Sequence, residues 1–291
     1  MKAPEPLPDH AVGADCVAGV RTQIHDLVIR ITAPNPSMMT GPGTNTYVVG
    51  DDAVVVIDPG PVLEAHLDTV REAIDGRPVT AVAVTHHHVD HAPGARPLAD
   101  AVGAPVVGFG HAKLDVDLAA RDGHSLSAGS VALTAWFTPG HASDHLCFLA
   151  QPLGWLFSGD HLMEGSTVTI SPPDGDLSAY LASLARVRDD PRLTLLVPGH
   201  GRTVGDPAQA AADVLAHRAR RAEVVLAALR DHGPATAAAL RPHAYADVGP
   251  ERDAVATATC WAHLLALVDE GLASSSSTRD DAGAVFRAAS A

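Results

Sequence analysis

Short apolar runs alternate with amphipathic stretches along much of the chain. Aliphatic, mostly β-branched residues fill positions 54–57 and 81–85, a pattern typical of buried strands. Between these two runs, residues 62–74 carry apolar side chains at helical spacing. This strand–helix–strand order predicts an α/β fold.

The same patterns predict further elements before residue 206. We expect early strands at 24–31 and 47–49, later strands at 131–137, 155–157 and 193–197, and helices at 91–102 and 178–188.

The pattern changes at about residue 206. Asp206 and Pro207 are residue types of a helix cap and first turn, and one long alanine-rich helix should run to about residue 230. Residues 234–240 and 252–270 indicate further helices. We therefore expect three parts: a flexible arm at 1–20, a main catalytic domain at 21–205, and a small, mostly helical C-terminal module at 206–291.

Composition indicates a soluble protein with a large core. The chain has 291 residues, of which 46% are hydrophobic. No apolar run approaches the roughly 18 residues that span a bilayer. Residues 3–8 hold prolines and an acid where a signal peptide has an apolar stretch. We therefore predict a cytoplasmic protein without a membrane partner, whose three separated cysteines stay reduced.

The formal charge of −14 does not favour nucleic acid as a partner. Phosphate backbones are bound by clustered Lys and Arg. The densest basic run, residues 218–221, is predicted to be the solvated face of a helix. Residues 206–291 hold eight Lys plus Arg and eleven Asp plus Glu, a net charge of 8 − 11 = −3. A nucleic-acid partner therefore stays an open alternative that the charge does not favour.

The six residues from His86 to His91 carry the strongest chemical signal. They read His-His-His-Val-Asp-His and directly follow the predicted strand at 81–85. Residues two apart in extended chain project to the same side, so His86 and His88 can point together, with Asp90 and His91 in the following turn. Imidazole nitrogens and carboxylate oxygens are ligands for zinc and similar divalent metals. The motif therefore predicts a metal site at this strand end.

Three more candidate ligands, His141, Asp160 and His200, each follow a short apolar run and sit in a turn with glycine or proline. Loops at strand ends are where sites are usually built. Asp58, which precedes Pro59, is open to two interpretations. It forms an Asx turn, or it holds the histidine loop in place by hydrogen bonds.

The other histidines do not have a pattern that predicts catalysis. His87 lies between two candidate ligands and should point away from them. His145 and His161 lie near ligand turns, where a supporting or surface role is expected. His111 has no partner pattern.

In their order along the chain, these motifs resemble those of the metallo-β-lactamase superfamily, over residues 40–201. The resemblance implies an αββα sandwich, with two sheets face to face, helices outside and a metal site along one sheet edge. It also implies how the ligands are divided: His86, His88 and His141 for a first metal, Asp90, His91 and His200 for a second, and Asp160 as a bridge between them.

The finer resemblance is to the branch of glyoxalase II-like thioesterases and a single-strand endoribonuclease. Residues 43–47 and the pair His217-Arg218 carry it. It implies that the module at 206–291 is winged-helix-like. The chain lacks the cysteine ligand of the commonest true β-lactamases, so antibiotic hydrolysis is not expected.

The implied site predicts a metallo-hydrolase. A bound metal lowers the pKa of its water from 15.7 toward about 7, and a second metal helps to polarise the substrate oxygen. Asp90 would orient the attacking hydroxide and pass a proton to the leaving group. We expect two divalent ions, with Zn²⁺ as first choice, and a small thioester or ester as substrate. Two alternatives stay open: a single-strand endoribonuclease, and a mononuclear iron dioxygenase in which His91 and His200 would not hold metal.

Overall fold

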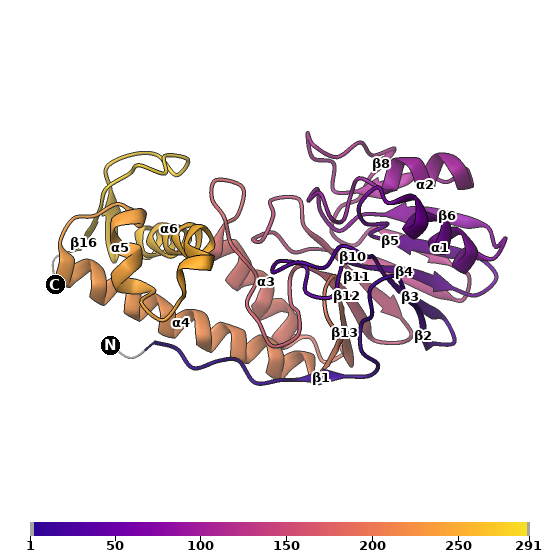
Figure 1. Cartoon of the computed structure of the whole chain (residues 1–291), viewed down its shortest axis with the longest axis horizontal. Coiled ribbons are helices and arrows are strands. Elements are labelled where there is room, and N and C mark those ends of the chain that lie inside the picture. The colour runs from indigo at the N-terminus through magenta and orange to yellow at the C-terminus, as the bar shows by residue number, and fades with distance from the viewer. Residues whose placement is uncertain (1–2, 290–291) are drawn as a thin grey trace.

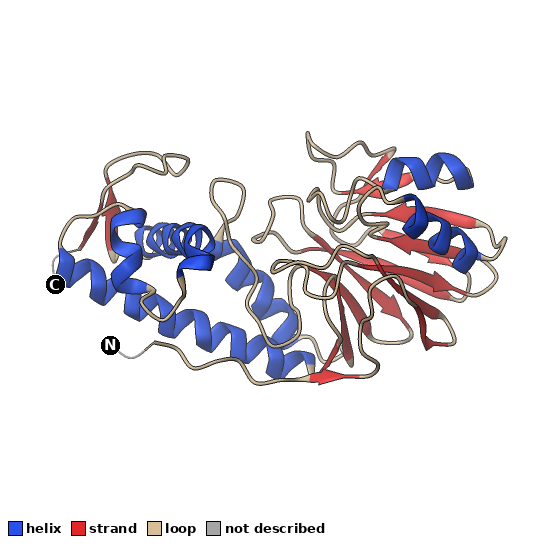
Figure 2. Cartoon of the chain, viewed as in Figure 1, coloured by secondary structure: helices blue, strands red, loops and turns tan. Residues whose placement is uncertain are grey.

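The computed structural model describes residues 3–289 and contains two seven-stranded sheets (Figures 1 and 2). The sheets stack face to face, and helices cover the outer face of each. The structure confirms the α/β fold that the hydrophobic pattern predicts and the sandwich that the family resemblance implies.

The first sheet is formed by the N-terminal half of the main domain. In spatial order its strands are β2 (Arg21–His25), β3 (Val28–Thr32), β4 (Asn45–Gly50), β5 (Val54–Ile57), β6 (Val79–Ala83), β7 (Val106–Gly108) and β8 (Leu118–Ala119). Helices α1 (Glu64–Ile74) and α2 (Ala95–Val102) lie on its outer face, where Leu67, Val70 and Leu98 pack against the strands.

Two expectations for this half are corrected by the structure. The run at 24–31 is not one strand, because the chain turns at residues 26–27 and its two halves pair antiparallel as β2 and β3. The helix predicted from residue 91 begins only at Ala95, because residues 89–94 form turns that keep His91 at the end of the sheet.

The second sheet comes mainly from the following part of the chain. In spatial order its strands are β1 (Ala11–Val12), β14 (Thr203–Gly205), β13 (Leu195–Pro198), β12 (Trp155–Gly159), β11 (Leu146–Gln151), β10 (Val131–Phe137) and β9 (Ser125–Ala128). Helix α3 (Leu177–Asp189) covers its outer face. Two residues of the predicted N-terminal arm form β1, which pairs with β14.

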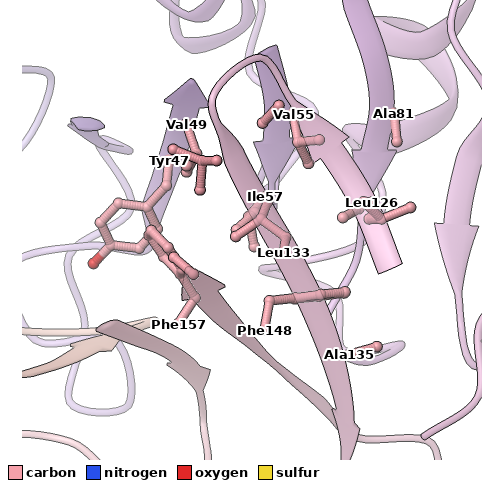
Figure 3. Close-up of a cluster of buried hydrophobic side chains, with 14 of the residues drawn as sticks. Tyr47, Val49, Val55, Ile57, Ala81, Leu126, Leu133, Ala135, Phe148 and Phe157 are labelled. Carbon is pink, nitrogen blue, oxygen red and sulfur yellow. The ribbon is translucent and has the colours of Figure 1, made fainter. Parts of the chain in front are cut away.

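Apolar side chains of the facing strands fill the space between the two sheets (Figure 3). Ile57 of the first sheet and Leu133 and Phe148 of the second are all but inaccessible to solvent. Tyr47 meets Phe157 edge to face, with ring centroids 5.2 Å apart. A close-packed core of this kind fixes the positions of the strand ends. The loop residues that directly follow the strands are therefore also held in fixed positions.

Helix α4 (Pro207–His232) leads from the second sheet into the C-terminal module (Figure 1). The Asp206 carboxylate caps it by accepting a hydrogen bond from the backbone N–H of Gln209. The module continues with α5 (Ala237–Ala244), a short 3-10 helix η1 (Pro250–Arg252), α6 (Asp253–Asp269) and a hairpin of β15 (Ala273–Ser275) and β16 (Phe286–Ala288). These elements share a core of their own.

The basic run on α4 is not the solvated face that its sequence predicts. Arg218 is 3% exposed and Arg221 5% exposed, whereas Arg220 lies in solvent. Residues three apart share one face of a helix, and here that face turns inward. Two of the basic side chains counted for the module therefore do not reach the surface.

Within residues 3–289, no helix is both long enough and apolar enough to cross a bilayer.

Candidate metal centre

The ends of the strands bring the predicted site residues together. β5 and β6 run parallel, and so do β12 and β13, so the loops after them open at the same edge. All eight predicted residues lie there: Asp58 after β5; His86, His88, Asp90 and His91 after β6; His141 after β10; Asp160 after β12; and His200 after β13.

The first group of donor atoms comes from His86, His88 and His141. Nδ1 of His88 lies 3.0 Å from Nε2 of His86 and 3.0 Å from Nε2 of His141. Two ligand atoms about 2.0 Å from a tetrahedral zinc ion are about 3.3 Å apart. The three nitrogens thus have nearly the spacing of ligands around one ion.

The second group comes from Asp90, His91 and His200. Nε2 of His91 and Nε2 of His200 are 3.3 Å apart. Oδ2 of Asp90 lies 3.2 Å from the His200 nitrogen and 3.4 Å from the His91 nitrogen. These distances also fit ligands of a single ion.

Asp160 faces both groups. Its Oδ1 lies 3.4 Å from Nε2 of His91 and 3.3 Å from Nε2 of His200, and its Oδ2 lies 3.6 Å from Nε2 of His141. Oδ1 is buried and has no hydrogen-bond partner among the described residues. A buried carboxylate oxygen without a donor is costly, and a cation between these groups would satisfy it.

Neighbouring acceptors fix the orientation of four imidazole rings. Nδ1 of His91 donates to Oδ2 of Asp58 over 2.9 Å, and Nδ1 of His141 donates to the carbonyl oxygen of Thr169 over 2.7 Å. The other two acceptors are the hydroxyl of Thr85, 3.0 Å from Nδ1 of His86, and the carbonyl oxygen of Gly43, 3.3 Å from Nδ1 of His200. With Nδ1 protonated, the neutral form of each ring has its Nε2 lone pair directed at the other candidate ligands, as metal binding requires.

Asp58 makes hydrogen bonds to the histidine loop, as in the second of the two interpretations given for it above. Besides His91, its carboxylate accepts hydrogen bonds from the backbone N–H and the hydroxyl of Thr85, both over 2.7 Å. The N–H of Gly60, which an Asx turn would use, donates instead to the carbonyl of His91. Asp58 therefore connects the ends of β5 and β6 beneath the histidine loop.

Sequence comparison with known proteins agrees with this geometry. A family model described as the metallo-beta-lactamase superfamily matches residues 39–114 and 112–200. The chain belongs to this superfamily. Its members typically bind metal ions, and the clustered His and Asp side chains could hold them here.

Individual members of the superfamily are moderately similar. The lactamase-like protein adaB of Aspergillus niger is 32% identical over 213 residues, which cover 71% of this chain and 65% of the relative. A protein of Aspergillus chevalieri named atrochrysone carboxyl ACP thioesterase is 31% identical over 216 residues, covering 70% of this chain and 66% of the relative. The matches thus span just under two thirds of either relative.

A solved superfamily structure extends the likeness to the C-terminal module. The beta-lactamase domain protein of Burkholderia ambifaria has a TM-score of 0.78 and covers 94% of both chains, at 23% sequence identity. At this identity the match shows a shared fold. Because it covers nearly the whole chain, the shared fold includes the C-terminal helices.

Burial keeps His86 and His88 of the first group neutral. It lowers the pKa of His88 to about 4, with the neighbouring His141 adding to the effect. It also holds the pKa of His86 well below the usual range. Neutral imidazole is the form that binds metal.

The second group favours positive charge. Burial alone would lower the pKa of His200, but the Asp160 and Asp90 carboxylates outweigh it and raise the value to about 9. Burial would raise the pKa of Asp90, yet hydrogen bonds from His200 and His91 hold it well below its usual range. Carboxylates that stay ionised beside these nitrogens create a site that a divalent cation would complete.

The structure also assembles a group that the sequence does not predict. As expected, His87 points away from the donor groups, and its Nδ1 lies 2.9 Å from Oδ1 of buried Asp144. Its ring stacks on His111, with centroids 4.3 Å apart and planes 17° apart. Nε2 of each ring is 3.9–4.0 Å from an oxygen of Asp174. Nearly parallel rings do not direct their lone pairs at one point, so we interpret this group as a contact that holds the cleft wall.

His145 has a supporting position. Its Nε2 accepts a hydrogen bond from the backbone N–H of Asp160 over 3.2 Å, and its Nδ1 lies 2.9 Å from the hydroxyl of Thr138. It therefore holds the backbone of Asp160 in place from behind. Its place in a turn near a ligand is the signal in the sequence that indicates this role.

A cleft of about 990 Å³ opens beside the donor groups. Its wall combines five of the predicted ligands with apolar side chains: Met39, Val89, Ala92, Pro93, Leu114 and Pro172. Two basic side chains, Arg96 and Lys113, also line the cleft. Arg96 is paired with Asp115 and Asp117, whereas Lys113 has no acidic partner within 4.0 Å among the described residues.

Proposed function

We propose that this protein is a metal-dependent hydrolase of small thioesters or esters, working with two divalent ions, Zn²⁺ as first choice. His86, His88 and His141 would hold one ion, Asp90, His91 and His200 the other, and Asp160 would bridge them. The position of Asp160 carries the proposal. Its carboxylate faces both groups of candidate ligands, and its buried Oδ1 has no hydrogen-bond partner within residues 3–289. A dioxygenase with one iron would not need His91 and His200 in this arrangement.

The bound ions would supply a water of lowered pKa and electrostatic stabilisation of the oxyanion that forms on the substrate. Asp90 would orient the attacking water and transfer a proton to the leaving group. Asp90 lines the cleft, and its Oδ2 accepts a hydrogen bond from the Thr44 hydroxyl over 3.3 Å. That contact would hold the carboxylate toward the reacting atoms.

The lining of the cleft supports a substrate with an apolar acyl chain and an anionic group. Met39, Val89 and Leu114 offer apolar surface beside the donor groups. Lys113, without a carboxylate of its own, would pair with a carboxylate or phosphate on the substrate. The thioesterase name of the A. chevalieri relative supports a thioester as the bond that is cleaved, and fits the glyoxalase II-like branch that residues 43–47 indicate.

A nucleic-acid substrate is less well supported. Helices α4, α5 and α6 with the β15–β16 hairpin fit the winged-helix-like module implied by the branch resemblance. However, Arg218 and Arg221 are buried, so they cannot contact phosphates. We propose that the module serves the metal centre rather than RNA.

A substrate panel tests this proposal. Metal-loaded protein would be assayed on acyl-CoA thioesters, a lactone, a phosphodiester and single-stranded RNA, before and after removal of metal with a chelator. We expect thioester hydrolysis that disappears on chelation and returns with Zn²⁺. Cleavage of RNA without turnover of any thioester or ester would favour the single-strand endoribonuclease over the thioester or ester hydrolase.

A further inference from the structure

We propose that Arg218 of helix α4 is a positioning residue for the metal centre, holding from behind the two segments that carry His141 and Asp160. The inference rests on the proposed metal site. A positioning role of Arg218 would explain why the basic face of α4 that holds Arg218 is buried, and would connect the His217-Arg218 pair with the candidate metal centre.

Arg218 has an unusual environment for a buried arginine. Its side chain is 3% exposed, and among residues 3–289 no carboxylate lies within ion-pair distance of it. Its Nη2 donates to the carbonyl oxygen of Val168 over 2.5 Å, and its buried Nε has no hydrogen-bond partner in the described part of the chain. A buried charge lacking an opposite charge is a poor source of stability. What it contacts is therefore the better guide to its role.

The first contact leads to His141. Val168 precedes Thr169, whose carbonyl oxygen accepts the hydrogen bond from Nδ1 of His141 over 2.7 Å. The following residue, Ile170, is fully buried. Arg218 thus anchors the peptide next to the acceptor that sets the orientation of the His141 ring. Loss of this anchor frees the acceptor to move, and the ring with it.

The second contact leads to Asp160. The Arg218 guanidinium lies 5.7 Å from the centroid of the Tyr180 ring, within reach of a cation–π interaction. The Tyr180 hydroxyl donates to the carbonyl oxygen of His161 over 2.8 Å, and His161 directly follows the bridging carboxylate. One side chain from the C-terminal module therefore contacts the supports of two different ligands.

Arg221 offers a matched control on the same helix face. It is 5% exposed, and its guanidinium pairs with Asp247 over 2.6 Å and lies 4.4 Å from the Tyr245 ring centroid. It also donates to the carbonyl oxygen of Ala244 over 2.8 Å. All these partners belong to the C-terminal module, so its loss should weaken the fold without reaching the metal ligands.

The experiment compares Arg218→Ala and Arg218→Lys with Arg221→Ala in the full-length protein. Zn²⁺ affinity would be measured by competition with a chromophoric chelator, thermal unfolding on the metal-free protein, and kcat and KM on whichever substrate is turned over. For Arg218→Ala we expect the affinity for one ion to fall about 10–100-fold, with a lower kcat, as for other residues that orient metal ligands. Arg218→Lys, which keeps a donor for the Val168 carbonyl, should be intermediate. Arg221→Ala should unfold at a lower temperature and keep both affinities within about twofold.

The outcomes separate the inference from the proposed function. A folded Arg218→Ala protein with parental metal affinities and kcat would overturn the inference about Arg218. An equal loss of metal affinity in Arg221→Ala would also overturn it, because it would indicate general destabilisation. If Arg218→Ala does not fold, Arg218→Lys decides by the same criteria. Affinities are measured without substrate, so failure to hydrolyse thioesters would leave the inference standing. A parent that binds no metal would overturn both.

Discussion

The carboxylate of Asp58 accepts a hydrogen bond from Nδ1 of His91 across 2.9 Å, while two further hydrogen bonds tie it to Thr85. Asp58 follows β5, whereas His91 and Thr85 follow β6. One side chain therefore sets the orientation of an inner histidine and joins two strand ends. In metal sites generally, hydrogen bonds of this kind orient the ligands and tune the affinity for metal.

Asp58→Asn should weaken metal binding by about 10–100-fold. Asn has one acceptor oxygen, and its amide nitrogen would face one of the three donors that now point at the carboxylate. Competition titration with a chelator measures the loss. Asp75→Asn is the matched control, since Asp75 shares the left-handed backbone conformation of Asp58 but lies exposed at a helix end. Parental affinity in Asp58→Asn would remove this role from the account.

Asp90→Asn should fold, hold metal in part and lose turnover. The change keeps size and one oxygen but removes the charge and the ability to accept a proton. Loss of one general acid–base group typically costs about 10²–10⁴-fold in kcat. Steady-state kinetics would be compared with Asp115→Asn, which alters an exposed carboxylate of the cleft wall. If kcat in Asp90→Asn stays within a few-fold of the parent, Asp90 is at most a structural ligand.

Lys113→Ala should raise KM for an anionic acyl thioester selectively. A partly exposed charge pair contributes about 1 kcal/mol, which corresponds to roughly three- to tenfold in KM. Succinyl-CoA and butyryl-CoA form a suitable pair, because their acyl chains have equal length and differ in the terminal carboxylate. Lys113→Arg should keep the preference. Equal changes in KM for both substrates would show that Lys113 does not recognise the acyl anion.

His66 should make the fold less stable in mild acid. Burial lowers its pKa from 6.5 to about 4, and its Nε2 lies 2.8 Å from the Thr46 hydroxyl, which itself donates to the Asp58 carbonyl. Between pH 6.5 and 4, His66 binds a proton in the unfolded chain but not in the folded protein. The contribution of neutral His66 to the free energy of unfolding is therefore complete above pH 6.5 and decreases as the pH drops toward 4. The loss can reach about 3 kcal/mol.

The control for His66 is His66→Gln, which keeps a donor for Thr46 but does not titrate. Urea unfolding of metal-free parent and variant between pH 7 and 4 would give the difference. The parent should lose stability faster than the variant. Parallel curves would assign the acid sensitivity to other groups.

The positions of the candidate ligands could be predicted from sequence because local order places each of them at a strand end. Spacing of two in extended chain places His86 and His88 on one side, and Asp90 and His91 fall in the turn that follows. The other three candidates, His141, Asp160 and His200, each follow an apolar run in a turn with glycine or proline. The alternation of strands and helices predicts an α/β fold, whereas the αββα layers are implied by the family resemblance alone.

Features that depend on distant packing were not accessible in this way. The stack of His87 on His111 needs two loops that only the folded sheet brings together. Arg218 and Arg221 have the composition of a solvated face. Their burial depends on segments distant in sequence, which include Val168 and Tyr180 for Arg218 and residues 244–247 for Arg221. The turn at residues 26–27 was hidden because Leu27 and Val28 continue the apolar pattern of the strand.

The most direct test of the account is a titration of the metal-free protein with Zn²⁺, in which the release of thiol from an acyl-CoA thioester is measured at each added equivalent. The donor groups around Asp160 predict that activity rises with bound metal and reaches its maximum at two ions per chain. A maximum at one ion per chain would contradict the two-metal site, and absence of thioester and ester hydrolysis at every equivalent would contradict the proposed function.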